Sequence, residues 1–148
     1  MKKIILSAVL LTAFLLGCSK SAADDGLNWE SNLETAIQKA KTENKAVLVN
    51  FTGSDWCVWC QRLSSEVFSK SEFKDYAEDN LILVKIDFPK NIEQSNETKL
   101  YNNMLAQKYA VQGFPTVLLF NSLGDLVLTT GYQEGGAENY VNHLKSNL

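Results

Sequence analysis

The chain has 148 residues, of which 45% are hydrophobic and 21% are charged, a composition typical of one globular domain rather than of a disordered or collagen-like protein. Its 14 Lys and Arg residues against 17 Asp and Glu residues give a net charge of −3, so the sequence predicts no nucleic-acid partner. Three cysteines are too few for a disulfide-stapled mini-protein, and the odd number requires a separate explanation for one of them.

The N-terminus has the features of an export signal. Two lysines follow Met1, and an apolar run from Ile4 to Leu16 comes next, shorter than the roughly 20 residues that a transmembrane helix needs. Gly17-Cys18 resembles the end of a bacterial lipoprotein signal, in which the cysteine is lipidated and becomes the mature N-terminus. We therefore expect a signal peptide over residues 1–17, lipidation at Cys18 and a polar tether over residues 18–26. An ordinary secretory signal is the alternative.

The first elements after the tether are predicted from a capping motif and an apolar run. Ser31-x-x-Glu34 has the form of a capping box, which predicts a helix from Asn32 to Glu43. The run from Ala46 to Phe51 is almost continuously apolar, as in a strand that is buried on both faces of a parallel sheet.

The next segment contains two cysteines at the start of a predicted helix. Apolar residues at i, i+3 and i+7 from Cys60 predict a helix over residues 57–68, whose first turn holds Cys57 and Cys60. A second capping box, Ser69-x-x-Glu72, predicts a short helix after it.

The second half of the chain alternates strands and helices. We expect a strand over residues 81–88, a loop over 90–99, a helix over 100–109, a hairpin of strands over 116–120 and 126–130, and an amphipathic C-terminal helix over 137–148. The order αβααβαββα predicts an α/β domain over residues 27–148. Its central mixed β-sheet, flanked by helices, would combine a parallel pair with the antiparallel hairpin.

The spacing of Cys57 and Cys60 favours redox chemistry. Two intervening residues bring both sulfurs onto one helical turn. At the helix start, unpaired N–H groups and the helix dipole stabilise a thiolate, which lowers the pKa of Cys57 from about 8.5. Cys60 lies one turn further in, on the buried stripe. We therefore expect an exposed nucleophile and a less accessible resolving thiol.

Three other interpretations of the cysteine pair are weaker. A zinc site lacks further ligands, because the other candidates are Cys18 at the far N-terminus and His143 in the last helix. A structural disulfide across so short a loop adds little stability, and inert buried thiols do not favour a helix start. We expect no metal and no organic cofactor at this site, and no catalytic part for His143.

Two segments identify a family. Ala46–Cys60 (AVLVNFTGSDWCVWC) and Leu105–Phe120 (LAQKYAVQGFPTVLLF) resemble the thioredoxin superfamily, in particular its exported thiol-disulfide interchange proteins. The resemblance implies a thioredoxin fold, with Cys57 as the attacking cysteine and Cys60 as the resolving cysteine.

The same resemblance implies a substrate-binding surface. Trp56 matches the aromatic residue that shields the pair, and Pro115 matches a cis-proline that faces the disulfide. The backbone of Phe114 would pair with an extended substrate segment. Trp59 lies beside the nucleophile, and we interpret it as a substrate platform; the alternative is a cap on the helix.

The sequence departs from the family at two places. Asn50 stands where thioredoxins have a buried Asp, and Leu83 stands at the position of its Lys partner, so we expect both members of that ion pair to be absent. Water, the departing substrate thiolate or Asp55 would then activate Cys60. The Val58-Trp59 dipeptide lacks the His of oxidases and isomerases, which argues against a strong oxidant.

These features predict a monomeric thiol-disulfide oxidoreductase that reduces or isomerises disulfides of exported proteins. Its partners would be those substrates, a membrane or periplasmic redox protein, and the membrane itself through the lipid at Cys18. We expect it in the bacterial cell envelope. Two alternatives are a non-catalytic binding module that uses the cis-proline groove and a Cu(I) carrier that uses the two thiols.

Overall fold

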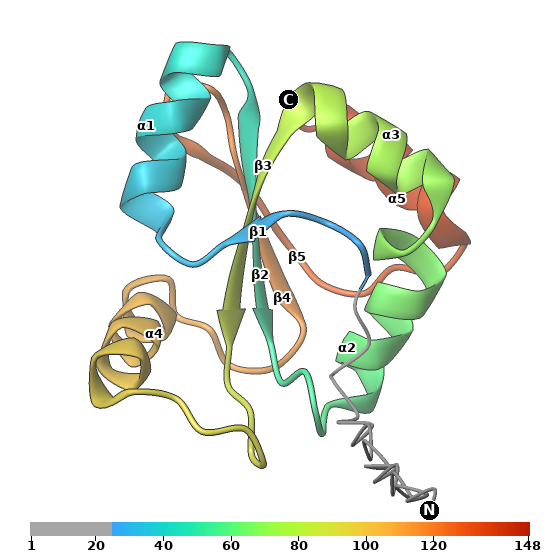
Figure 1. Cartoon of the computed structure of the whole chain (residues 1–148). Helices are drawn as coiled ribbons and strands as arrows, with labels where there is room; N and C mark the ends of the chain where they lie inside the picture. The colour runs from blue at the N-terminus through green and yellow to red at the C-terminus, as the bar shows by residue number, and fades with distance from the viewer. Residues whose placement is uncertain (1–24) are drawn as a thin grey trace, which may run out of the picture.

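One five-stranded sheet with the strand order β1-β3-β2-β4-β5 forms the centre of the domain (Figure 1). The computed structural model describes residues 25–148, so the predicted signal peptide and Cys18 lie outside the described residues. The strands are β1 (Trp29–Glu30), β2 (Ala46–Thr52), β3 (Leu81–Asp87), β4 (Thr116–Phe120) and β5 (Leu126–Thr130). The first three run parallel, and β4 and β5 are added antiparallel, which confirms the predicted mixed sheet.

Helices cover both faces of the sheet (Figure 1). One face carries α1 (Leu33–Glu43) and α4 (Asn96–Lys108). The other carries α2 (Val58–Leu63), its π-helical continuation η1 (Ser64–Phe68), α3 (Ser71–Asn80) and α5 (Gly136–Lys145). All seven residues of β2 are buried, because both faces of this central strand are covered, as its apolar run predicts.

Both predicted capping boxes are wrong. Asn32 caps α1, and its side chain accepts the N–H of Thr35 at 2.7 Å. At the second site η1 extends the preceding helix to residue 68. Ser69 therefore closes that helix, and its hydroxyl donates to the Ser65 carbonyl. Lys70 stands at the N-cap of α3 without a side-chain hydrogen bond.

Helix α4 begins at Asn96, four residues before the predicted start at Leu100. Ser95 caps it by accepting the N–H of Thr98 at 3.2 Å. The first turn of this helix consists of polar residues, and its sequence therefore resembles a loop. Leu100, where we expected the helix to begin, is 73% exposed and does not belong to the core. Asn102 is the buried polar residue of this helix, and its amide donates to the Asp87 carbonyl at the end of β3.

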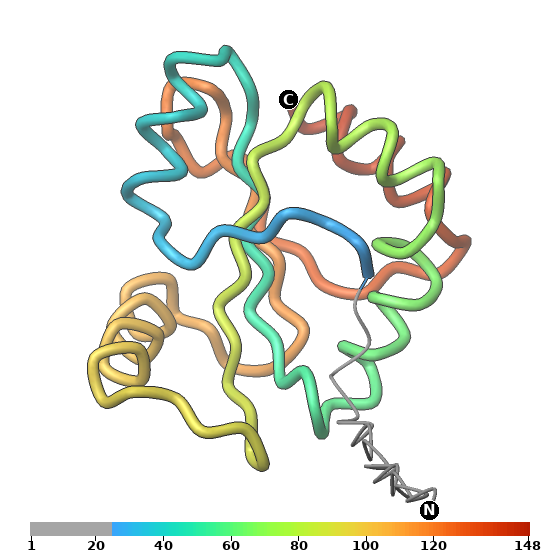
Figure 2. The backbone as a smooth tube through the Cα atoms, in the orientation of Figure 1, coloured from blue at the N-terminus to red at the C-terminus, as the bar shows by residue number. Residues whose placement is uncertain are grey.

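The described chain begins with a segment and a short strand, β1, that lie before the first element predicted from the sequence. Asp25, which we placed in the tether, is buried, and its carboxylate accepts the indole N–H of Trp29 at 2.9 Å. Trp29 lies in β1 and contacts Phe68 edge to face at 5.3 Å. Figure 2 traces this N-terminal segment across the sheet toward α2 and η1. Asp25 therefore packs against the domain, although we placed it in the tether.

Candidate active site

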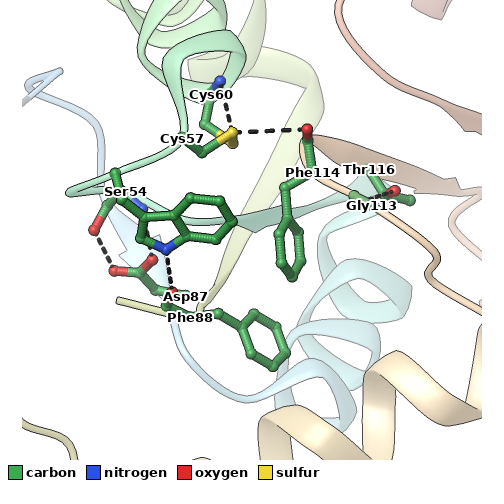
Figure 3. The surroundings of a disulfide bond; sticks show 9 residues. Ser54, Cys57, Cys60, Asp87, Phe88, Gly113, Phe114 and Thr116 are labelled. Atoms are coloured by element: carbon green, nitrogen blue, oxygen red, sulfur yellow. Dashed lines mark hydrogen bonds between the residues drawn. A yellow bond between two sulfur atoms is a disulfide. The ribbon is translucent and has the colours of Figure 1, made fainter. Parts of the chain in front are cut away.

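The two cysteines of the predicted redox pair form a disulfide bond at the start of α2 (Figure 3). Cys57 is the N-cap residue, and the Cys60 N–H points at its sulfur at 3.2 Å. In the reduced protein this N–H and the helix dipole would stabilise a Cys57 thiolate. The pairing and the place at the helix start agree with the prediction.

The expected difference in exposure between the cysteines is wrong for the disulfide form. Both residues are 6% exposed. Their surroundings differ instead: the Cys57 sulfur lies 3.6 Å from the Phe114 carbonyl oxygen and receives the Cys60 N–H, whereas Cys60 lies inside the first turn of α2 (Figure 3). Of these two groups, the Cys60 N–H favours a thiolate at Cys57, whereas the Phe114 carbonyl oxygen can only accept a proton from its thiol.

The loop before β4 faces the disulfide, as the sequence predicts. The Phe114–Pro115 peptide bond is cis, which confirms the expectation for Pro115. The Thr116 hydroxyl donates to the Gly113 carbonyl at 2.7 Å and closes this turn (Figure 3). The loop after β5 packs directly on it, because a Cβ atom at Gly131 would lie 2.9 Å from the Pro115 carbonyl oxygen.

One side of the disulfide is lined by three aromatic residues, which we call the Trp56 wall: Trp56, Phe88 and Phe114. The Trp56 indole N–H donates to the Phe88 carbonyl at 2.8 Å. The Phe114 ring contacts Trp56 at 6.0 Å and stacks on Phe88 at 5.0 Å between centroids. Gly53 makes room for the indole, because a Cβ atom there would lie 2.5 Å from it. Phe88 and Gly53 were not singled out in the sequence.

Two carboxylates fix the loops under the Trp56 wall. Asp87 accepts the main-chain N–H and the hydroxyl of Ser54 (Figure 3). Asp55 accepts the N–H groups of Lys90 and Asn91, and these hydrogen bonds hold the pKa of the Asp55 carboxyl below its ordinary value. Asp55 therefore anchors the loop after β3, and main-chain N–H groups occupy its carboxylate oxygens.

Asn50 lies in β2 on the sheet face that α2 covers. It is 5% exposed, and within residues 25–148 its side-chain oxygen is the one buried polar side-chain atom without a hydrogen-bond partner. A neutral amide thus occupies the expected position of the family carboxylate, and it cannot take up a proton.

The expectation that the lysine is also absent is wrong. Leu83 is paired with Leu48, whereas Lys85 lies directly beside Asn50 in the parallel register. The Lys85 ammonium group lies 3.8 Å from the buried Asp25 carboxylate and 4.9 Å from the centre of the Trp29 ring. The cation on this face therefore finds its counter-ion in the N-terminal segment, a long-range contact that residue spacing does not reveal.

The predicted platform residue Trp59 lies on the surface beside the disulfide and is 51% exposed. Its indole contacts the ring of Tyr132 at 5.4 Å between centroids. Tyr132 directly follows Gly131 in the loop that packs on Pro115, so Trp59 and the cis-proline loop belong to one surface. Tyr132 was not identified from the sequence.

Within residues 25–148 there is neither a cluster of metal-ligating side chains nor a helix fit to cross a membrane. No group of three or more His, Cys, Asp or Glu residues in this part of the chain is arranged to hold a metal ion. None of the helices described there has the length and apolar character that crossing a membrane requires.

Known proteins are similar to this chain in sequence and in architecture. A family model described as a thioredoxin-like domain matches residues 33–146. The disulfide bond reductase DsbH of Chlamydia pneumoniae is 35% identical over 130 residues, which cover 88% of this chain and 78% of the relative. The thiol:disulfide interchange protein DsbD of Vibrio cholerae is 29% identical over 97 residues, 66% of this chain but 15% of that longer protein.

Solved structures agree with these relatives. A structure of a DsbH oxidoreductase superposes with a TM-score of 0.76 at 34% identity and covers 92% of this chain and 93% of its own. The oxidised C-terminal domain of Neisseria meningitidis DsbD superposes with a TM-score of 0.58 at 15% identity, covering 82% of this chain and all of that domain, and shows the shared fold alone.

Proposed function

The chain belongs to the thioredoxin-like domain family and is a thiol-disulfide oxidoreductase; from this premise we propose that it reduces disulfides of exported proteins with Cys57 as the nucleophile and Cys60 as the resolving thiol. The observation that carries the proposal is the Cys57–Cys60 disulfide at the N-cap of α2, with the Phe114 carbonyl 3.6 Å from the Cys57 sulfur.

The reaction exchanges one dithiol for one disulfide. The Cys57 thiolate attacks a substrate sulfur, forms a mixed disulfide and releases the first substrate thiolate. Cys60 loses its proton and attacks the Cys57 sulfur, which releases the second thiolate and leaves Cys57–Cys60 oxidised. Two electrons pass to the substrate, so a donor dithiol protein must reduce the pair again.

Proton removal from Cys60 would not use a buried carboxylate. Asn50 is neutral and Asp55 is held by main-chain N–H groups. The departing substrate thiolate is the strongest base that the reaction itself brings to the site, and it takes the Cys60 proton directly or through a water molecule.

Reduction is favoured over oxidation. A relative that aligns with 88% of this chain is named a disulfide bond reductase, and the Val58-Trp59 dipeptide supplies no imidazolium to stabilise the Cys57 thiolate further. Other relatives are named protein disulfide-isomerases, so isomerisation is the alternative direction for the same residue pair.

The proposed location is the bacterial cell envelope, with a lipid on Cys18. The support is the charged and apolar start of the chain, the Gly17-Cys18 pair and the short distance in sequence from Cys18 to the buried Asp25. Acyl chains would hold the domain close to a membrane surface, because each buried methylene contributes about 0.8 kcal/mol.

The test is reduction of a disulfide-bonded protein such as insulin with dithiothreitol as electron donor. Cys57→Ser should lose the catalysed rate completely, and Cys60→Ser should accumulate mixed disulfides visible on a non-reducing gel. Cys18→Ser is the matched control: we expect full activity from it in solution and loss of membrane attachment in cells. If Cys57→Ser kept the wild-type rate, the mechanism would be wrong.

The reduction potential of the pair separates the remaining functions. A value near that of thioredoxin, about −270 mV, would support a reductant, and one near about −120 mV would contradict it in favour of an oxidase. A much lower value without catalysed turnover would support the non-catalytic binding module.

A further inference from the structure

A second surface adjoins the disulfide and is centred on Trp59 rather than on Trp56. It comprises Trp59, Arg62, Glu66 and Tyr132, and we call it the Trp59 wall. In the strand order, β3 lies on one side of β2, and β4 and then β5 lie on the other. Phe88 directly follows β3, and Tyr132 follows β5 by two residues. Phe88 and Tyr132 therefore come from opposite sides of β2, whereas Phe114 precedes β4 and adjoins Pro115, on which the loop with Tyr132 packs.

The members of the Trp59 wall form a closed set of contacts. The Arg62 guanidinium donates to Glu66 at 2.9 Å, one turn along the helix, and the Tyr132 hydroxyl donates to the other oxygen of Glu66. The Arg62 guanidinium carbon lies 5.1 Å from the Trp59 ring centre and 5.2 Å from the Tyr132 ring centre. Glu66 thus holds both groups that contact the Trp59 indole.

Within the Trp59 wall, Glu66 and Arg62 form an ion pair beside the two aromatic rings. The hydrogen bond from Tyr132, followed by that from Arg62, holds the pKa of Glu66 below its ordinary value, so Glu66 is ionised at neutral pH. An ionised Glu66 balances the one arginine of the chain, and the wall therefore carries no net charge from this pair. The accessible surface of the wall therefore combines the half-exposed Trp59 ring with a paired cation and anion.

The fold does not need this surface for its core. The buried residues on this face of the sheet come from the strands, η1, α3 and α5 together with Leu63, whereas Trp59 is 51% exposed and the Arg62 and Glu66 side chains are 46% and 37% exposed. A large exposed indole that is held in place beside a reactive bond is typical of a contact surface.

We propose that Arg62, Glu66 and Tyr132 are positioning residues that hold Trp59 as a platform for a large apolar side chain of a polypeptide substrate. This inference rests on the proposed function and names its substrate class: an extended cysteine-containing segment with an aromatic or large aliphatic residue close to the cysteine. The segment would lie across the disulfide. Trp59 lies between the two cysteines in the sequence, so the platform is continuous with the reacting disulfide. A polypeptide that brings its own cysteine to this disulfide is therefore the molecule that would contact the platform.

The test compares three disulfide substrates with the purified full chain. One is a small compound, hydroxyethyl disulfide, which is too small to reach the platform. The others are two disulfide-linked peptides that are identical except for Phe or Ser two residues from the cysteine. With dithiothreitol as electron donor and its uncatalysed rate subtracted, we expect wild-type protein to reduce the Phe peptide with a KM about five- to tenfold below that for the Ser peptide and with a similar kcat.

Tyr132→Phe removes one hydroxyl and leaves the ring. Because one hydrogen bond to a charged group is lost, we expect the KM for the Phe peptide to rise about fivefold, with little change in kcat and none with hydroxyethyl disulfide. Tyr101→Phe is the matched control, since the Tyr101 hydroxyl donates to Glu34 on the opposite face of the sheet at 2.5 Å. Trp59→Ala should abolish the preference for Phe, and Trp59→Phe should restore part of it.

The outcomes separate the two levels of the proposal. Equal KM values of wild type for both peptides, or a Tyr132→Phe protein indistinguishable from Tyr101→Phe, would overturn the platform while turnover of the substrates still supports the oxidoreductase. A fall in kcat with all three substrates would show that Tyr132 acts on the chemistry and would also overturn it. Failure of the wild type to reduce any of the three would instead remove the proposed function.

Discussion

The two walls beside the disulfide place an indole ring in different ways. Trp56 is 37% exposed, and its N–H is bound to a main-chain carbonyl, that of Phe88. Trp59 is 51% exposed and is placed by side chains alone, the guanidinium of Arg62 and the ring of Tyr132. The position of Trp56 therefore follows from the path of the backbone, whereas that of Trp59 depends on an ionised carboxylate.

This difference shows how one site can keep the shape of one wall constant while the shape of the other wall varies. A hydrogen bond to the main chain persists as long as the fold does, so the Trp56 wall keeps its shape near the nucleophile. An exposed network of side chains can be altered by substitution, salt or pH without a change in the sheet. Chemistry would then be tied to one wall and substrate preference to the other.

The largest contrast is expected from removing each indole. Trp56→Ala loses a hydrogen bond and a ring contact with Phe114 and should lower the free energy of unfolding by about 2 kcal/mol, less than for a fully buried tryptophan. Trp59→Ala removes a ring that is half exposed and should cost less than about 1 kcal/mol. Urea unfolding of the oxidised proteins measures both, and equal losses would contradict the division between the walls.

A smaller effect is expected from crowding the Trp56 indole. Gly53→Ala would place a Cβ atom 2.5 Å from the ring, so the indole must shift and its bond to the Phe88 carbonyl must lengthen. We expect a loss of about 1.5 kcal/mol in the free energy of unfolding. Gly113→Ala is the control in the neighbouring loop, because no atom lies within 4 Å of the Cβ position there. Similar unfolding midpoints for the two variants would mean that the indole is not fixed by the backbone.

The smallest effect is a response of the Trp59 wall to acid. The pKa of Glu66 is lowered in the folded protein, so its stabilising contacts are complete above pH 4.5, its ordinary value, and are lost as the pH falls through the lowered value. We expect the Trp59 contribution to fluorescence, taken as the difference between wild type and Trp59→Phe, to change in that range.

Glu66→Gln supplies the reference for this acid response. Asp55, under the Trp56 wall, also has a lowered pKa and titrates in the same direction, so acid alone does not distinguish the walls. In the Glu66→Gln protein the acid transition in the Trp59 signal should be absent. If it persisted unchanged, Glu66 would not control the position of Trp59.

Much of the fold could be predicted because its signals are local. The apolar run at Ala46, the turn composition between residues 120 and 126 and the periodicity after Cys57 each lie within a dozen residues. Errors occurred where a neighbouring element decided the outcome. The start of helix α4 was predicted too late because its first turn is polar and carries no apolar periodicity. The position of this helix depends on contacts such as that of Asn102 with the end of β3.

The candidate site divides in the same way. Cys57, Cys60 and Pro115 are identifiable because spacing and family resemblance mark them. Tyr132, Phe88 and the pairing of Lys85 with Asp25 are not, since each depends on segments far apart in the chain. Asp25 lies 60 residues before Lys85, in a segment with the composition of a tether.

The sequence by itself therefore determined the chemistry of this protein: a CxxC pair at a strand-to-helix turn, the element order and a family whose members exchange disulfides. Only the tertiary structure decided the surroundings of that chemistry: two aromatic walls, a neutral amide at Asn50 beneath the helix, and a cation on the same face whose counter-ion comes from the N-terminus. The physical reason is the distance along the chain over which each kind of interaction acts. Helix dipoles and turn preferences act within a few residues, whereas ring contacts and ion pairs join whatever the sheet brings together.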